Sequence, residues 1–419
     1  MDIRTQAQAR AGYTARLRRR FHENPEAGPA EQAETMAAIE AELDALGIAH
    51  ERVPGGGVFG FIEGGRPGRT LLMRSDIDAL MMDESACNLA GPKVCVSKRP
   101  GVAHMCGHDA HIAMQLTEAA LLSEMAAELP GRIVLMFEQG EEKTCGILPL
   151  CRYIGESGLH IDGCYATHVR WDIPSGKIGV CSGTAMMGLY QFHLSIDGAS
   201  GHGSRPDLAR NTIDCFHMIY AALEQQRMTA VRPDTRLTWS VCHVEAGVTH
   251  NIIPDHLVAE GTVRFEDRAG GAAFWRRFHE IAQAMGALCG CTVSLTHKGY
   301  LLPTAGEPHC MAMLAREADA ALGAGTVLPC SPWMASESFS YMTGMYPGAF
   351  CFVGIQNDAL GTGANHHTPE FDVDESAMTV GVTAAVAYAR AFLMNPPETD
   401  AFEPVCPDMA ALIELVTAQ

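Results

Sequence analysis

The spacing of apolar residues changes several times along this chain. Residues 30–47 (AEQAETMAAIEAELDALG) have the spacing of an amphipathic helix that ends at Gly47. Unbroken apolar runs at 68–76 and 131–139 predict buried strands, and residues 111–129 predict a helix between them. This alternation of strands and helices predicts a largely parallel sheet covered by helices.

The pattern changes at about residue 186 and returns after residue 300. Between these points we expect a strand, a helix, two strands, a helix and a strand, which is the ferredoxin-like order. These elements should span residues 190–198, 210–228, 236–246, 255–266, 270–288 and 291–299. We therefore expect a small domain, 186–299, inserted between the two parts, 1–185 and 300–419, of a larger α/β domain.

Composition excludes some partners. Hydrophobic residues make up 47% and charged residues 19%, as in a globular protein, and the formal net charge is −19. Nucleic acids and anionic membranes should repel such an acidic chain, so we expect neither as a partner. The basic cluster Arg18-Arg19-Arg20 lies in a helical stretch, and we interpret it as a solvated face.

The sequence also indicates a compartment. It shows no signal-peptide pattern at its start and no apolar run long enough to cross a bilayer. Its 15 cysteines lack the spacing of a disulfide framework. We therefore expect a cytoplasmic protein whose thiols are mostly buried and inert.

The segment HMCGHDAH, residues 104–111, is rich in metal-ligating residue types. Cys106 and His108 are two apart, so their side chains can project the same way, and Gly107 lets the backbone approach an ion. Thiolate and imidazole suit zinc and similar divalent metals. A hydrogen-bonded histidine beside a buried cysteine, or a thiol nucleophile with a histidine base, would explain this segment equally well.

Other segments supply further candidates. The pair Glu141-Glu142 follows a predicted strand, at the edge where open parallel sheets bind ligands, although two solvated glutamates capping a helix would look the same. His168 ends a short predicted strand, His366-His367 lies in a Gly/Asn/Pro loop, and His202 lies between glycines of the inserted domain. Taken alone, each histidine also fits a structural role or an exposed loop. Together the candidates match a two-metal site with the ligands Cys106, His108, Glu142, His168 and His367, and with Glu141 left as a base.

Motifs from almost end to end of the chain carry a family resemblance. They include RRRFHENPE (18–26), RSDIDAL (74–80), HMCGHDAHIAM (104–114), GASGHGSRP (198–206) and HHTPEFDVDE (366–375). With them the chain resembles the bimetallic amidohydrolases of the aminoacylase–carboxypeptidase kind. That branch includes hippurate hydrolases, N-acyl-amino-acid amidohydrolases and plant auxin–amino-acid hydrolases.

The resemblance implies an architecture and a set of roles. It implies a zinc-exopeptidase-like catalytic domain with an inserted α+β lid and dimerisation domain, and two divalent ions (Zn, Mn, Co or Ni) bridged by a Cys106 thiolate. Glu141 would be the general base, and His202 the lid histidine that steadies the oxyanion. Asn251 and Arg264 would be lid residues at the polar end of the substrate. Asp76, Asp78 and Asp109 would be carboxylates behind the ligands.

The chain departs from the family pattern at two places. Gln139-Gly140 stands where a Pro-Ala pair is usual, and Met81 where a proline is usual, which concerns substrate fit more than the metal site. His367 is preferred to His366 as the ligand because it stands two residues before Pro369, as in the family.

We therefore expect a metal-activated water to hydrolyse the amide bond of an N-acyl amino acid. A small dipeptide or amino-acid conjugate is the alternative substrate, and a homodimer or higher homo-oligomer through the lid domain is the expected assembly. Hinge motion is expected near residues 184–188 and 299–303. Thiol chemistry at Cys106 leaves the glutamates and distant histidines unexplained, and Glu141 disfavours a metal-binding protein without turnover.

Overall fold

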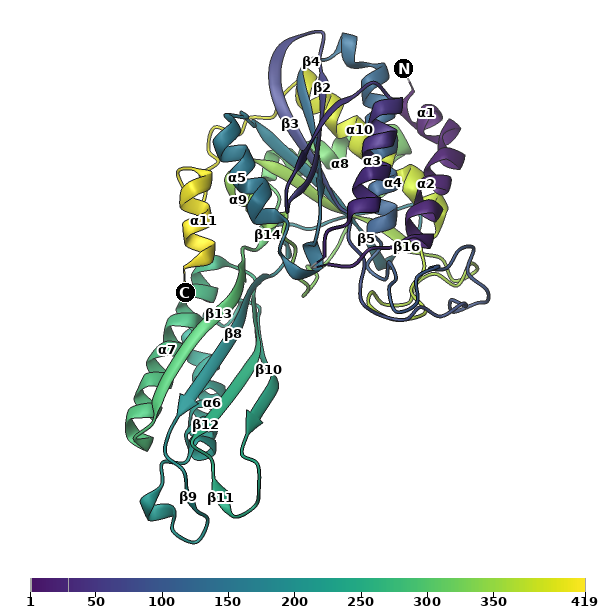
Figure 1. The fold of residues 1–419 in the computed structure, drawn as a ribbon. Helices are drawn as coiled ribbons and strands as arrows, with labels where there is room; N and C mark the ends of the chain where they lie inside the picture. Colours follow the sequence, from purple (N-terminus) through teal and green to yellow (C-terminus); the bar gives the residue numbers. More distant parts are fainter. Residues whose placement is uncertain (1, 29, 419) are drawn as a thin grey trace. The chain divides into compact units, whose positions relative to one another are not determined.

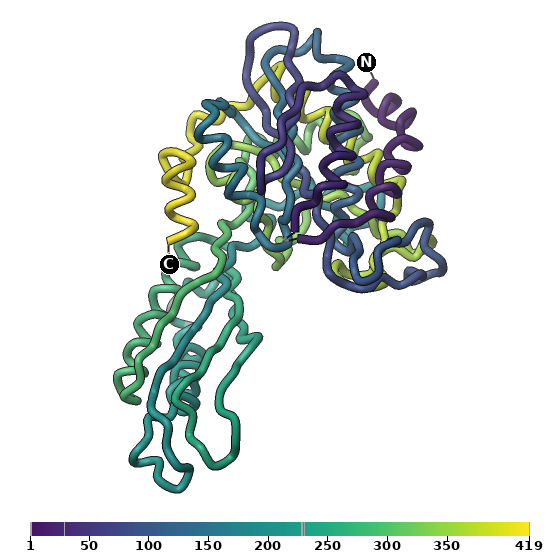
Figure 2. The backbone as a smooth tube through the Cα atoms, viewed as in Figure 1, coloured from purple at the N-terminus to yellow at the C-terminus, as the bar shows by residue number. Residues whose placement is uncertain are grey.

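The computed structural model describes residues 2–28 and 30–418, and it divides into two compact units that are described separately. Unit 1 comprises Met1–Ala185, Ala305–Ser331 and Tyr341–Ile413, and unit 2 comprises Met186–Thr304, Pro332–Ser340 and Glu414–Gln419. Figure 2 shows the first (purple) part of the chain in unit 1 and the middle (teal to green) part in unit 2. Segments 332–340 and 414–419, which lie within the expected range 300–419 of the larger domain, thus group with unit 2.

An eight-stranded mixed sheet forms the centre of unit 1, in the order β1-β2-β4-β3-β5-β16-β6-β15 (Figure 1). Its strands are β1 (Ala49–Val53), β2 (Gly57–Glu63), β3 (Arg66–Asp76), β4 (Pro130–Glu138), β5 (Gly163–Pro174), β6 (Ile178–Val180), β15 (Val327–Pro329) and β16 (Gly348–Gln356). The four central strands β4, β3, β5 and β16 are parallel, which confirms the expected parallel sheet, whereas the β1-β2-β4 side is antiparallel.

Helices α3 (Ala33–Ala45), α4 (His108–Glu124), α5 (Ile147–Ser157), α8 (Pro308–Leu322) and α10 (Glu375–Met394) pack on this sheet. Helices α1 (Ile3–Ala9) and α2 (Ala11–Glu23) pack on α4 and α10. The chain also forms α9 (Ser340–Met345) and α11 (Met409–Thr417). The core helix α4 is buried on all sides from His108 to Leu122 and packs on β3 and α10. Helix α10 is long and apolar enough to cross a membrane, but most of it is buried in the protein.

Arg18 contradicts the interpretation of the basic cluster as a solvated face. The buried residues of α2 recur at helical spacing, and Arg18 lies on that stripe with only 1% exposure. Its guanidinium lies 2.8 Å from Asp109 and 3.1 Å from Asp372. A buried guanidinium requires such partners, and these lie too far along the chain for a local pattern to reveal.

Unit 2 has the expected order of strands and helices. Its main elements are β8 (Gly188–Asp197), α6 (Thr212–Ala230), β10 (Leu237–Ala246), β12 (His256–Phe265), α7 (Arg268–Cys289) and β13 (Thr292–Leu301). The sheet is antiparallel with the order β10-β12-β8-β13, and α6 and α7 pack against each other and on the sheet. Asn211 and Asp267 cap the two helices by accepting backbone N–H bonds, so the helices begin where polar cap residues precede apolar runs.

Candidate metal centre

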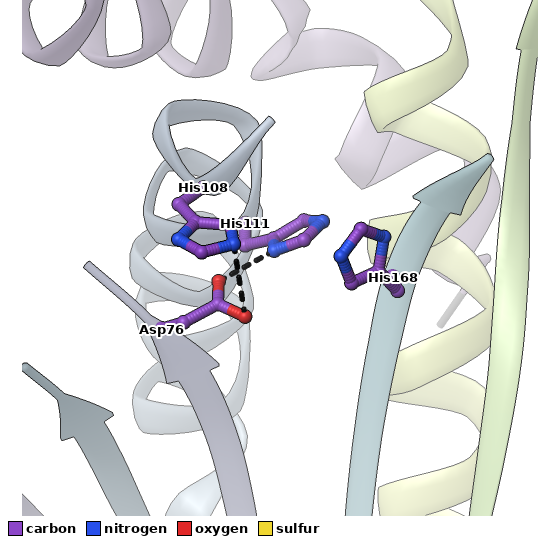
Figure 3. Close-up of side chains that lie close together, drawn as sticks. All are labelled: Asp76, His108, His111 and His168. Atoms are coloured by element: carbon purple, nitrogen blue, oxygen red, sulfur yellow. Dashed lines mark hydrogen bonds and ion pairs between the residues drawn. The ribbon is translucent and has the colours of Figure 1, made fainter. Parts of the chain in front are cut away.

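Four buried side chains from three elements of unit 1 meet where β3 ends. Asp76 is the last residue of β3, His108 and His111 belong to the first turn of α4, and His168 lies on β5 (Figure 3). Each offers a ligand atom within 4.8 Å of the others. Strand β5 continues past His168 to Pro174, so this histidine lies within a longer strand than its sequence predicts.

Gly107 brings the loop of HMCGHDAH close to β5. Its φ of +93° lies in the left-handed region, and a Cβ there would lie 2.4 Å from Cγ2 of Val169. A side chain at this position would therefore push the start of α4 away from β5. Glycine thus allows Cys106, on one side of it, and His108, on the other, to approach His168.

Hydrogen bonds on Nδ1 orient two of the three candidate ligand histidines, His108 and His168. Nδ1 of His108 lies 2.9 Å from the carbonyl oxygen of Asp78, and Nδ1 of His168 lies 2.6 Å from that of Val169. Because a carbonyl can only accept, Nδ1 donates the hydrogen bond in both rings, which leaves Nε2 as the nitrogen that can bind a metal ion. Nε2 of His168 lies 3.6 Å from the Cys106 sulfur.

His111 has a different role. Its Nδ1 lies 2.6 Å from Asp76, and its Nε2 accepts the backbone N–H of Val169 at 2.9 Å. Both ring nitrogens are therefore occupied, so His111 supports Asp76 and β5 instead of supplying a ligand. The motifs predict no role for His111, although its position three residues after His108 places both on one face of α4.

A second group of ligand atoms consists of Cys106, Glu142 and His367, again within 4.8 Å of one another. Nε2 of His367 lies 3.2 Å from Oε1 of Glu142. His367 adopts a φ of +60°, which is uncommon for a residue with a Cβ and typical of functional sites. The neighbouring His366 instead lies buried, with Nδ1 3.1 Å from the carbonyl oxygen of Cys106.

Asp78 holds the two glutamates in place. They form the short 3₁₀ turn η2 (Glu141–Lys143) after β4, and both of their backbone N–H groups donate to the Asp78 carboxylate at 3.1 Å. Gly140, one of the departures from the family pattern, has a φ of +61°, and the Cys145 sulfur occupies the space of its missing Cβ. The turn therefore depends on glycine at this position.

Burial and neighbouring charges shift the pKa values of the titratable groups in the cluster. Burial and the charge of Glu142 raise the pKa of the Cys106 thiol well above its usual value. Burial opposes the charged form of His108, but the Asp76 carboxylate raises the pKa of this imidazole well above its usual value. Burial likewise opposes ionisation of Glu142, yet His367 and His108 lower its pKa. A cation in this cluster would favour both the thiolate and the carboxylate.

The residues fit a pair of divalent cations. Nε2 of His108 and Oε1 of Glu142 are buried, and among the described residues neither has a partner with hydrogen-bond geometry, although Asp76 lies 3.5 Å from the first atom and His367 lies 3.2 Å from the second. Such atoms are costly to desolvate unless they bind something. His108 and Glu142 also form a third group with Glu141, so each belongs to two overlapping groups, as two adjacent ions would require. Sulfur, imidazole and carboxylate donors suit zinc-like ions. The structure thus brings together all five predicted ligands and the predicted base.

The three remaining predicted site residues lie in unit 2. His202, in the short strand β9 (Gly201–His202), pairs with β11 (Ile252–Ile253), so it lies close to Asn251. Strand β11 ends shortly before the first residue of β12, whereas Arg264 lies near the last residue of β12. Nη1 of Arg264 donates to Ser336 Oγ at 2.7 Å. The strand from His256 to Arg264 is roughly 25 Å long. His202 and Asn251 are thus brought together, but not with Arg264.

Comparisons with known proteins agree with this geometry. Residues 72–391 match the sequence profile of "Peptidase family M20/M25/M40". An IAA-amino acid hydrolase of Arabidopsis thaliana is 30% identical over 386 residues, covering 90% of this chain and 85% of that protein. An N-acetylcysteine deacetylase of Bacillus subtilis is 31% identical over 372 residues, covering 87% and 92%. The crystal structure of a dinuclear metal binding peptidase of the M20 family from Bacillus subtilis superposes with a TM-score of 0.76 and 28% identity, covering 92% of this chain and 99% of that one.

Proposed function

Because the chain belongs to peptidase family M20/M25/M40 and is a metal-dependent amidohydrolase, we propose that it hydrolyses the amide bond of N-acyl amino acids. Two relatives that it matches over most of its length are named for amides of this class, an IAA-amino acid and N-acetylcysteine. The observation that carries the proposal is the convergence of buried ligand atoms in overlapping groups, with His108 and Glu142 each belonging to two of these groups.

We assign the cations to the five predicted ligands. Cys106 lies between the two groups, beside His168 on one side and with Glu142 and His367 on the other, which supports it as the shared ligand. Divalent cations bound there would acidify a water molecule and polarise the amide carbonyl. Zn, Mn, Co and Ni all accept this donor set, so the proposal names the class of ion.

Glu141 is proposed as the general base. Its carboxylate lies in the group with His108 and Glu142, and Asp78 fixes its backbone. Glu141 would take a proton from the attacking water and pass it to the amide nitrogen. The water oxygen then becomes part of the released carboxylic acid, and the proton leaves on the free amino acid.

The residues of unit 2 support a dimeric enzyme. We assign His202 to the oxyanion and Arg264 to the substrate carboxylate, which a guanidinium can bind with two hydrogen bonds. Because these residues lie near opposite ends of β12, one small substrate cannot contact both from a single copy of unit 2. We therefore propose a homodimer in which one chain supplies His202 and Asn251 and its partner supplies Arg264. The cytoplasmic location remains a prediction.

The variant Glu141→Gln tests the assignment. It should lower kcat on N-acyl amino acids by at least about 10²-fold and leave the metal content per chain unchanged by elemental analysis. Glu142→Gln is the matched control, because loss of a ligand should lower metal content as well as kcat. Near-normal turnover by Glu141→Gln, with Mn²⁺, Zn²⁺, Co²⁺ or Ni²⁺ bound, would show that Glu141 is not the base.

A further inference from the structure

Two cysteines face each other at the edge of the unit 1 sheet. Cys181 directly follows β6 and Cys330 directly follows β15, and the last paired residues of these parallel strands are Val180 and Pro329. The Cys330 N–H donates to the Val180 carbonyl at 3.0 Å, which continues the ladder by one residue. The two sulfur atoms lie 3.2 Å apart. We propose that Cys181 and Cys330 form a reversible disulfide, which makes them a site of oxidative modification.

The backbone already has the spacing that a disulfide needs. Neighbouring strands lie about 4.8 Å apart, and disulfides join Cα atoms about 4.4–6.8 Å apart. The sulfurs lie close to van der Waals contact on the same face, so the bond forms by side-chain rotation without moving either strand. Most thiols of this chain are expected to be inert, and this pair is an exception that its sequence hides, because the two cysteines are 149 residues apart.

The two thiols differ in accessibility and in their surrounding charges, so they have different roles in the reaction. Cys181 is 2% exposed, whereas Cys330 is partly exposed and can meet an oxidant. A hydrogen bond from the Cys181 thiol and the positive charge of Arg170 lower the pKa of Cys330, which increases its thiolate fraction. Cys330 is therefore the attacking thiol and Cys181 the resolving one.

The oxidant is a low-molecular-weight disulfide, RSSR. The Cys330 thiolate attacks one sulfur of RSSR, which forms a mixed disulfide and releases RS⁻. Cys181 then loses its proton and attacks the Cys330 sulfur, which forms the protein disulfide and releases the second RS⁻. Two protein thiols give up two electrons and two protons, and RSSR becomes two RSH. A dithiol reductant reverses the sequence.

The bond would lie beside the segment that carries His168. The carbonyl oxygen of Ser331, next to Cys330, accepts a hydrogen bond of 2.7 Å from Arg170, two residues after His168 on β5. Arg170 also pairs with Asp172 and lies 4.8 Å from the centre of the Phe352 ring on β16. Oxidation would thus link the ends of β6 and β15 covalently, next to the contacts of Arg170. It closes a long loop, which restricts the unfolded chain and stabilises unit 1.

Peptide mapping of the metal-loaded protein tests the proposal. Pre-reduced protein is treated with oxidised glutathione, blocked with an alkylating agent and digested without reductant. We expect a cross-linked peptide pair that contains Cys181 and Cys330 and lacks two hydrogens. The midpoint of thermal unfolding should rise by an amount on the order of 5 °C, and dithiothreitol should reverse both changes.

Two variants make the outcome specific. Cys330→Ser should abolish the cross-link and the thermal shift, whereas Cys87→Ser, at an exposed cysteine elsewhere in unit 1, should leave both intact. Alkylation of both Cys181 and Cys330 under conditions that oxidise other cysteines would overturn the proposal. So would a cross-link from either cysteine to a different partner. These readouts do not require turnover, so they are independent of the proposed hydrolysis.

Discussion

Burial of the Glu118 carboxyl group makes the free energy of unfolding of unit 1 fall as pH rises. It lies on α4, two turns after His111 and one turn after Gln115 on the face toward the sheet, and is 3% exposed. Gln115 donates to the carbonyl oxygens of Met73 and Met136, but Oε1 of Glu118 has no hydrogen-bond partner among the described residues. Burial therefore raises the pKa of Glu118 from 4.5 to about 8.

The sign and size of the effect follow from proton linkage. Between pH 4.5 and 8 the folded chain keeps the Glu118 proton and the unfolded chain loses it, so the free energy of unfolding falls with rising pH. Each pH unit in this range costs about 1.4 kcal/mol, which amounts to about 5 kcal/mol above pH 8. Glu118→Gln keeps the shape of the side chain and removes the titration.

Calorimetry of the metal-loaded protein between pH 5 and pH 9 measures this effect. Glu118→Gln and the unmodified chain should unfold at similar temperatures near pH 5, and the variant should become progressively more stable toward pH 9. Glu128→Gln, at an exposed glutamate just beyond the end of α4, should show no such pH-dependent gain. A stability difference between Glu118→Gln and the unmodified chain that stays constant across this range would refute the reasoning.

Two further predictions concern the site and the assembly. His111→Gln removes the ring that joins Asp76 to β5, so metal affinity, measured by competition with a chelator, should fall by roughly 10–100-fold; unchanged affinity would contradict the supporting role. In a homodimer whose site takes His202 from the partner chain, mixing inactive Glu141→Gln and His202→Ala chains should restore up to about a quarter of normal activity, whereas each variant alone stays inactive; no recovery after confirmed subunit exchange would contradict the shared site.

The sequence was most informative where local spacing decides the structure. The expected strands and helices of unit 2 are present to within about two residues, because period, turn residues and caps are local signals. The ligand set was found in part from the residue types at strand ends and loops, and in part from the resemblance of its motifs. Asn251 and Arg264 came from the resemblance alone, as did the role of His202, which the sequence shows only as a loop histidine between glycines. Spacing along the chain could not show that a whole strand separates Arg264 from the other two.

Partners distant in sequence could not be predicted in this way. Arg18 reads as one of three surface arginines until its partners Asp109 and Asp372 are known. The facing thiols of Cys181 and Cys330 are equally hidden, because their pairing depends on β6 and β15 being neighbours at the sheet edge. Each is a pairing between segments that only the folded sheet brings together.

The two aspartates of RSDIDAL explain how one short segment organises the whole site. Asp76 binds His111 and lies 3.5 Å from Nε2 of His108, so it sets the histidine side of the cluster. The Asp78 carboxylate accepts hydrogen bonds from His108 Nδ1 and from the backbone N–H groups of both glutamates. A single side chain therefore positions a ligand and the proposed base together. A ligand and a base held by one anchor keep their relative geometry when the surrounding loops move. Hydrolysis depends on that geometry, because the base must reach a water whose position the ligands determine.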